Sequence, residues 1–203
     1  MRQIRSIIVA VAVLALGGAT MAFAGSAGSS GEGGRYQGDD GRGDDRDHRS
    51  RGRVASATLV DATGETVGRV WMREDRRDGV VYLEASVRDL PPGFHGFHIH
   101  EFGRCEAPGF TTAGGHLNPT GATHGEHAGD LPSLLVTDDG EATLATATDR
   151  FSLADLRDAD GSAVMVHSGP DNFANIPARY GGPDEETLST GDAGSRLACG
   201  VVR

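Results

Sequence analysis

Apolar and polar residues alternate in several short stretches that begin after residue 53. The clearest is VYLEASV, residues 81–87, where apolar residues occupy every second position. This period of two predicts a β-strand with one buried face and one solvated face. Residues 163–166 and 197–202 are mainly apolar and predict two more strands.

Two pairs of strand-like stretches flank short turn sequences. Residues 54–60 and 67–74 lie on either side of DATG, and residues 133–137 and 141–147 lie on either side of DDG. Asp and Gly accept the backbone angles that tight turns require. Each pair is therefore predicted to form a β-hairpin.

Helix is indicated at one place, residues 152–157, where Ser152 and Asp155 have the spacing of a capping box. Residues 101–132 and 168–195 follow neither the helical nor the strand period and are predicted to be irregular connections. The pattern therefore predicts an all-β fold, an antiparallel sandwich or barrel with two long loops. Loops of this length usually carry function.

The N-terminal residues have the features of an export signal. Arg2 and Arg5 precede an apolar run at residues 7–16, and AFA stands before Gly25. Residues 1–24 are therefore predicted to be a secretory signal peptide, and the protein to be secreted or extracytoplasmic, in the periplasm or cell envelope. The apolar run is short for a bilayer span, so an uncleaved membrane anchor is the weaker alternative. No stable membrane insertion is expected after cleavage.

Residues 25–53 are rich in Gly, Ser, Asp and Arg and contain no aliphatic run. Six arginines against six acidic residues leave this segment nearly neutral but too polar to build a core. It is predicted to be a disordered linker, in which His48 is interpreted as solvated rather than as a metal ligand.

The folded domain is predicted at residues 54–203 and is strongly acidic. It has eleven arginines, no lysine and 23 acidic residues, a net formal charge of −12. Because the nucleic-acid backbone is also negative, a nucleic-acid partner is not expected.

Most of the eight histidines are crowded into the first long loop and the strand before it. His98 and His100 are one residue apart near the end of that strand, so their side chains are expected on one face, with Ile99 in the core. His116 follows in the loop, and His167 ends another predicted strand. These four imidazoles are candidates for a copper site, because nitrogen ligands suit copper(II).

A second cluster follows at His124, His127 and Asp130. These residue types bind zinc, which takes four ligands in a tetrahedral site. His116 could complete this cluster as well as the copper set, because an imidazolate has two nitrogens. One shared ring would then join the two metals.

Five motifs resemble those of secreted copper/zinc superoxide dismutases and occur in the order found in that family: GFHGFHIHEFG, AGGHLNP, HAGDLP, VMVH and TGDAGSRLACGV. The resemblance extends over residues 54–203. It implies an eight-stranded antiparallel Greek-key β-barrel and an enzyme that converts superoxide to O2 and H2O2 with copper and zinc as cofactors.

The resemblance also implies roles for individual residues. Copper would be bound by His98, His100, His116 and His167, and zinc by His116, His124, His127 and Asp130. The bridging His116 would leave copper on reduction and take up a proton, and Arg196 would attract the superoxide anion, so both are catalytic candidates. Asp171 would link a copper histidine to a zinc histidine, and Cys105 would pair with Cys199 in a disulfide. His95 has no place in the ligand pattern and is expected to pack structurally.

Two other functions compete with an exported dismutase. One is a non-catalytic protein that binds and buffers copper on the same fold, which loss of a copper histidine or of Arg196 would favour. The other is a zinc hydrolase, which fits poorly because its metal needs an open position and this set is closed at four. Only two residues separate His124 from His127, which leaves zinc occupancy open, and the protein is expected to be a monomer or a homodimer.

Overall fold

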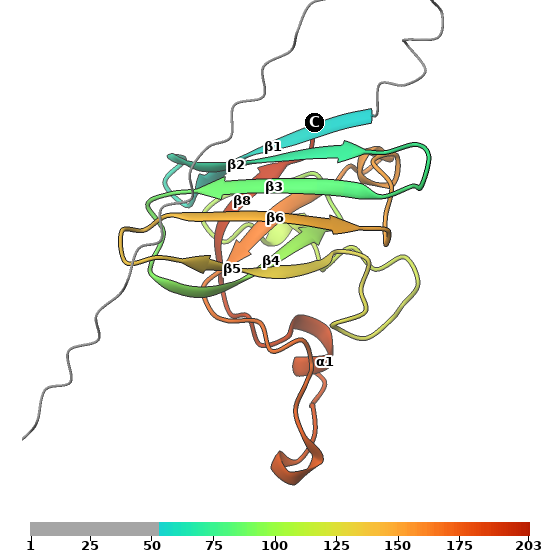
Figure 1. Ribbon diagram of the computed structural model, residues 1–203. Coiled ribbons are helices and arrows are strands. Elements are labelled where there is room, and N and C mark those ends of the chain that lie inside the picture. Colours follow the sequence, from blue (N-terminus) through green and yellow to red (C-terminus); the bar gives the residue numbers. More distant parts are fainter. Residues whose placement is uncertain (1–52) are drawn as a thin grey trace, which may run out of the picture. The chain divides into compact units, whose positions relative to one another are not determined.

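The structure is a computed structural model that describes residues 53–203 (Figure 1). Eight strands make up most of it: β1 (Arg53–Asp61), β2 (Thr66–Glu74), β3 (Val81–Val87), β4 (Gly93–His100), β5 (Asp130–Val136), β6 (Ala142–Thr148), β7 (Ala163–His167) and β8 (Arg196–Val201). A four-residue helix, α1 (Thr187–Thr190), lies in the last long loop. The predicted signal peptide and nearly all of the predicted linker lie outside the described residues, although β1 begins at Arg53, the last residue assigned to that linker.

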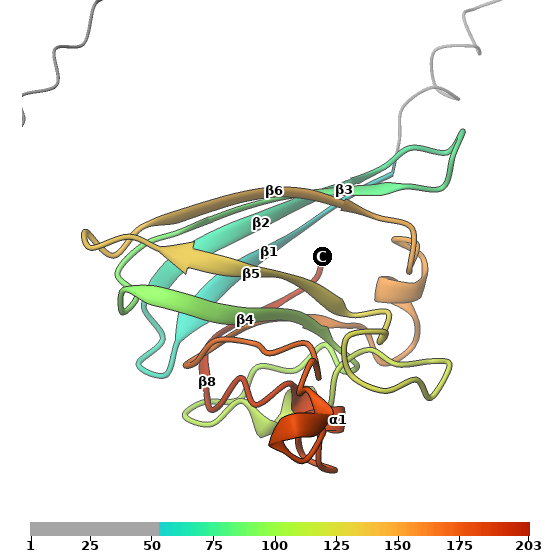
Figure 2. The same ribbon diagram turned by 60° about the horizontal axis from the view of Figure 1, so that its bottom comes forward.

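The strands form one antiparallel sheet in the order β5-β4-β7-β8-β1-β2-β3-β6. Its two end strands, β5 and β6, lie in contact, so the sheet curls into a nearly closed barrel. Figure 2 shows β6, β3, β2 and β1 above β5, β4 and β8. The prediction of an eight-stranded all-β barrel is confirmed.

The first predicted hairpin is confirmed, and the second is wrong. β1 pairs with β2 along nearly its full length. The turn at residues 138–140 does form, since the amide of Thr137 donates to the carbonyl of Glu141 at 2.9 Å. However, β5 pairs with β4, and β6 pairs with β3. The turn residues determine that the chain reverses, but not which strand supplies the ladder hydrogen bonds on either side.

The single helical turn predicted at residues 152–157 is present as a 3-10 turn, Asp155–Arg157. Its capping box is present, because the amide and hydroxyl of Ser152 donate to Asp155 Oδ2 and the Asp155 amide donates to Ser152 Oγ. The first long loop is shorter than predicted, since β5 already begins at Asp130. No helix within residues 53–203 is long and apolar enough to cross a membrane.

Two separate hydrophobic clusters lie on the two sides of β4 and β7. The barrel interior holds Ile99 of β4 together with Val164 and Val166 of β7, as the alternation predicts. On β7, Ala163 and Met165 belong instead to a second cluster, which also contains Phe110, Ala113 and Cys199. The first long loop therefore packs against the outer face of the barrel.

Both long loops cover that outer face. In Figure 2 the segments that contain residues 101–129 and 168–195 gather below β4 and β8, with α1 among them. The disulfide between Cys105 and Cys199 joins the first loop to β8, with the two Cα atoms 5.6 Å apart. This confirms the predicted pairing and ties the loop to the barrel wall.

Candidate metal centre

The four histidines of the predicted copper set meet on the outer face of β4 and β7. His98 and His100 belong to β4, opposite in direction to Ile99, and His167 ends the neighbouring β7. His116 comes from the first loop, where an isolated bridge pairs it with His100. One nitrogen from each of the four rings lies within 4.8 Å of the others, and all four residues are buried.

Hydrogen bonds orient two of these rings toward the common centre. His100 Nδ1 donates to the carbonyl of Gly114 at 3.0 Å, and His167 Nδ1 donates to the carbonyl of Gly194 at 3.1 Å. Each bond leaves the Nε2 lone pair free, and the two Nε2 atoms face each other at 3.3 Å. A neutral imidazole with its other nitrogen held in this way is a typical metal ligand.

Burial keeps the same rings neutral. Burial is the main cause of lowered pKa values, about 4 for His98 and about 3 for His167. Neighbouring positive groups act in the same direction, and for His98 the hydrogen bond to Asp171 opposes them. The pKa of His100 is lowered well below its ordinary value by the same causes. At neutral pH these nitrogens therefore carry lone pairs that can bind a cation.

The predicted zinc residues surround one carboxylate oxygen. Oδ1 of Asp130 lies 3.0 Å from Nδ1 of His116, 3.2 Å from Nδ1 of His124 and 3.3 Å from Nδ1 of His127. Nδ1 of His127 also lies 3.3 Å from Nδ1 of His116. Ligand atoms on a tetrahedral zinc ion with bonds of 2.0–2.1 Å lie roughly 3.3 Å apart, so these four residues have the spacing of such a site.

Two buried nitrogens support the same interpretation. His98 Nδ1 and His124 Nδ1 have no hydrogen-bond partner, although His124 Nδ1 is close to Asp130 Oδ1. An orphaned buried nitrogen is costly unless something binds it. One orphan belongs to each donor set, and a metal ion at each centre would satisfy both.

His98 also lies close to part of the second set, within 4.8 Å of His116, His124 and Asp130. We assign it to the first set alone. Its Nε2 is already bonded to Asp171, while His127 has the tetrahedral spacing to two members of the second set.

Asp171 joins the two sets. Its Oδ2 accepts from His98 Nε2 and its Oδ1 accepts from His124 Nε2, both at 2.7 Å. Oδ1 also accepts from the amide of Phe173 at 2.7 Å, so this side chain caps a turn as well as linking the histidines. Burial would raise the pKa of Asp171, but the hydrogen bonds from His124 and His98 hold it below its ordinary value.

Two neighbouring carboxylates change the pKa of His124. Burial lowers its pKa, but the neighbouring carboxylates of Asp130 and Asp171 outweigh burial and raise the pKa to about 9. Without metal, the second set therefore holds a proton on His124. The carboxylates thus provide a site that is already suited to positive charge.

Arg196 borders the first set. Its Nη1 donates to the carbonyl of Phe110 at 2.5 Å, and its Nη2 donates to that of Gly114 at 2.6 Å. Arg196 Nη2 and His100 Nδ1 share the carbonyl of Gly114, and Arg196 is the register partner of His167 in β7 and β8, so the guanidinium lies beside the copper set. Its charge contributes to the lowered pKa values of His100 and His167. The side chain is half-buried and fixed to the first loop, so it is not a freely solvated charge.

His95 stands outside both sets. Its Nδ1 lies 2.7 Å from the carbonyl of His167, and its Nε2 lies 2.8 Å from the carbonyl of Pro91. Both nitrogens are thus directed at main-chain oxygens. These contacts agree with the structural role expected for His95.

Comparison with known proteins provides the family. A family model described as copper/zinc superoxide dismutase (SODC) matches residues 66–202, most of the described barrel. The chain belongs to the copper/zinc superoxide dismutase family.

Curated members of the superoxide dismutase family resemble the chain in sequence. "Superoxide dismutase [Cu-Zn]" of Mycolicibacterium paratuberculosis is 52% identical over 56% of this chain and 57% of its own length. "Superoxide dismutase [Cu-Zn] 2" of Aquifex aeolicus is 35% identical over 73% of this chain and 86% of its own length. The chain thus spans less than two thirds of the length of its mycobacterial relatives.

A solved structure supports the same family. The crystal structure of a double mutant of a superoxide dismutase-like protein from Bacillus subtilis is 34% identical, with a TM-score of 0.62. The match covers 72% of this chain and 95% of the other. The chain therefore shares its fold with a superoxide dismutase-like protein.

Two residues that shape the site, Gly125 and Arg150, lie outside the superoxide dismutase motifs, and Gly191 lies within one of them without a role of its own. Arg150 binds the loop that carries His124, although a single arginine after a strand gives no sequence signal. Gly125 has a φ of +89°, which L side chains rarely adopt, and Gly191 lies directly against Asp171. Glycines at these positions are visible in the sequence, but their neighbours are not.

Proposed function

We propose that this protein dismutates superoxide to O2 and H2O2 in the extracytoplasmic space. Copper would be held by His98, His100, His116 and His167, and zinc by His116, His124, His127 and Asp130. The observation that carries the proposal is the arrangement of two donor sets that share one imidazole and are linked a second time through Asp171.

When bound, copper supplies one-electron redox chemistry and zinc supplies fixed positive charge beside it. His116 has Nδ1 in the zinc set, which leaves Nε2 for the copper set. The same ring nitrogen can hold a proton when it is not a ligand, so His116 is suited to deliver a proton to a reduced oxygen species. Asp171 fixes the rings of His98 and His124, so both keep their Nδ1 atoms directed at the metals.

Arg196 provides the local positive charge for an anionic substrate. The described domain is acidic overall, so approach of superoxide depends on the field near the copper set rather than on the total charge. The carbonyls of Phe110 and Gly114 hold the guanidinium in place beside His100 and His167. A fixed cation at this position attracts a small anion without having to bind it tightly.

Two observations favour an extracytoplasmic location. The disulfide between Cys105 and Cys199 is stable in oxidising compartments and rare in the cytosol. The features of a signal peptide at residues 1–24 agree with export, although they lie outside the described residues. A monomer or homodimer stays the prediction for the assembly.

The test is superoxide dismutation by the purified protein, with copper and zinc counted in the same sample. We expect the rate to follow copper content and to disappear when copper is removed. Arg196→Ala should retain copper but react several-fold more slowly at low salt, with a smaller difference at high salt because the attraction is screened.

The alternative, a copper-buffering protein, gives a different result. Stoichiometric copper without catalysis would favour it and contradict the proposal. If Arg196→Ala reacts as fast as the wild type at low salt, Arg196 does not guide the anion. Arg157→Ala is the matched control, because Arg157 also donates to two main-chain oxygens, those of Val54 and Arg203.

A further inference from the structure

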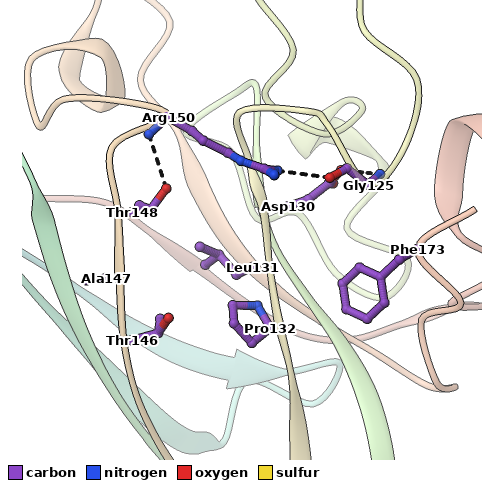
Figure 3. Close-up of a pocket in the computed structure, with 9 residues that line it drawn as sticks. All are labelled: Gly125, Asp130, Leu131, Pro132, Thr146, Ala147, Thr148, Arg150 and Phe173. Carbon is purple, nitrogen blue, oxygen red and sulfur yellow. Dashed lines mark hydrogen bonds between the residues drawn. The ribbon is translucent and has the colours of Figure 1, made fainter.

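Arg150 reaches from the end of β6 to the loop that carries two of the proposed zinc ligands (Figure 3). Its Nη1 donates to the carbonyl of Gly125 at 3.0 Å and to the carbonyl of His127 at 3.2 Å. The side chain thus connects this loop with a strand that contributes no ligand to either set.

The backbone amides of Gly125 and His127 are hydrogen-bonded as well. The amides of Gly125 and His127 donate to Asp130 Oδ2 at 2.7 Å and 3.1 Å. Asp130 therefore uses Oδ2 to shape the loop and keeps Oδ1 for the histidines. Arg150 binds the carbonyls of Gly125 and His127, and Asp130 binds the amides of the same two residues. One cation and one carboxylate together therefore fix the conformation of the loop backbone.

The surrounding fold explains why a side chain is needed here. β5 and β6 are the end strands of the sheet and are not joined by a hydrogen-bonded ladder in the described residues. A cavity of about 350 Å³ lies at this seam, lined by Leu131, Pro132, Thr146, Thr148 and Phe173 among others (Figure 3). Arg150 is among the residues that line this cavity. It connects the loop to the end of β6, where no ladder hydrogen bonds join β5 to β6.

The loop itself is short and conformationally demanding. Only two residues separate His124 from His127, and Gly125 between them has a φ of +89°. A Cβ atom at Gly125 would lie 2.8 Å from the carbonyl oxygen of Phe173, so the loop also packs closely on the second long loop. Small shifts of this backbone would move the Nδ1 atoms of both histidines away from their common centre.

We propose that Arg150 is a positioning residue for zinc, which holds the main chain around His124 and His127 in the shape that directs their Nδ1 atoms at Asp130 Oδ1. This rests on the proposed function, because it takes the zinc set as assigned there. The copper ligands on β4 and β7 have other supports. Arg150 therefore acts on zinc affinity and leaves copper binding largely unaffected.

The test compares Zn²⁺ affinity in the wild type, Arg150→Met, Arg150→Lys and Arg157→Met. Affinity is measured by competition with a chelator, and the site geometry by the absorption spectrum of Co²⁺ bound in place of Zn²⁺. Partners that orient ligands typically change metal affinity 10- to 100-fold, so we expect Arg150→Met to bind Zn²⁺ at least about 10-fold more weakly and to give an altered Co²⁺ spectrum.

Rescue distinguishes positioning from general stability. A lysine ammonium can donate to both carbonyls, so Arg150→Lys should regain most of the Zn²⁺ affinity and the wild-type Co²⁺ spectrum. Arg157→Met also loses two bonds to main-chain oxygens, those of Val54 and Arg203, and should bind Zn²⁺ like the wild type. Copper affinity should remain within about twofold in all variants.

Several results would overturn the inference. The inference is wrong if Arg150→Met binds Zn²⁺ as tightly as the wild type. It is also wrong if Arg157→Met loses as much Zn²⁺ affinity as Arg150→Met does. If Arg150→Met does not fold, the polar variant Arg150→Gln replaces it. Its amide nitrogen ends two bonds short of the position of Arg150 Nη1, so both bonds to the loop carbonyls are lost, and unchanged affinity there would count equally against the proposal. A wild-type protein that binds no Zn²⁺ would overturn the zinc set itself, a failure separate from that of Arg150.

Discussion

At the scale of single residues, the absence of a side chain matters as much as its presence. Gly191 has a φ of +63° and lies against the hydrogen bond between Asp171 and His124. A Cβ atom built there would lie 2.1 Å from Asp171 Oδ1 and 2.2 Å from His124 Nε2. No side chain fits without separating these two residues, so the link between the proposed metal sites depends on a glycine.

Gly191→Ala should therefore break or displace the bond between Asp171 and His124. We expect weaker Zn²⁺ binding and a loss of roughly 1–3 kcal/mol in the free energy of unfolding, since a buried carboxylate loses a partner. Denaturant unfolding and metal counting would measure both effects. Gly79→Ala is the control, because Gly79 also has a positive φ, +74°, but open space around its Cα. Equal effects in the two variants would show that backbone strain alone is responsible.

At the scale of elements, the two long loops are fixed to the barrel by different means. The disulfide between Cys105 and Cys199 joins the first loop to β8. Cys199 is fully buried and packs with Phe110 and Ala113 in the cluster outside the barrel. The carbonyl of Phe110 in turn holds Arg196, so this cluster stabilises the wall beside the proposed copper set.

The double variant Cys105→Ala/Cys199→Ala tests this connection. The disulfide closes a loop with a sequence separation of 94 residues, and the chain-entropy estimate for such a loop is roughly 4 to 5 kcal/mol of stability. We expect a loss approaching this value in denaturant unfolding, together with slower dismutation as Arg196 loses its fixed position. Alanine is chosen because a serine hydroxyl would be buried at position 199. If stability and rate both stay at the level of the oxidised wild type, the disulfide does not support this wall.

At the scale of the whole molecule, the donor sets make the metal-free protein sensitive to pH in two opposite ways. His98, His100 and His167 have lowered pKa values in the folded state, so below pH 6.5 the unfolded chain binds protons that the folded chain does not. His124 has a raised pKa of about 9 and adds stability below its ordinary pKa of 6.5. That contribution is lost as the pH rises from 6.5 to 9.

We therefore expect the stability of the metal-free protein to be greatest near pH 6.5, the ordinary pKa of histidine, and to fall on both sides. On the acid side the loss is up to roughly 1.4 kcal/mol per pH unit for each of the three neutral histidines. Urea unfolding of the chelated protein between pH 4.5 and 9 measures it. A constant m-value across the series serves as control, and a flat profile between pH 5 and 6.5 would contradict the argument.

The sequence by itself was enough for the parts of this protein that depend on local pattern. Alternation of apolar residues predicted β3, and the spacing of His98 and His100 placed both on the face opposite Ile99. These predictions succeeded because a strand has a fixed period of two, so neighbours in the sequence determine which residues share a face. The family motifs then indicated which distant histidines belong together.

The tertiary structure alone decided which segments pair and which side chains meet across the barrel. The turn at residues 138–140 formed as predicted, but its strands paired with β4 and β3 because sheet partners are chosen over the whole domain. Arg150 and Gly191 owe their importance to contacts with residues far away in sequence, which no local pattern records. Local backbone preferences act over a few residues, whereas a metal site is closed by long-range packing.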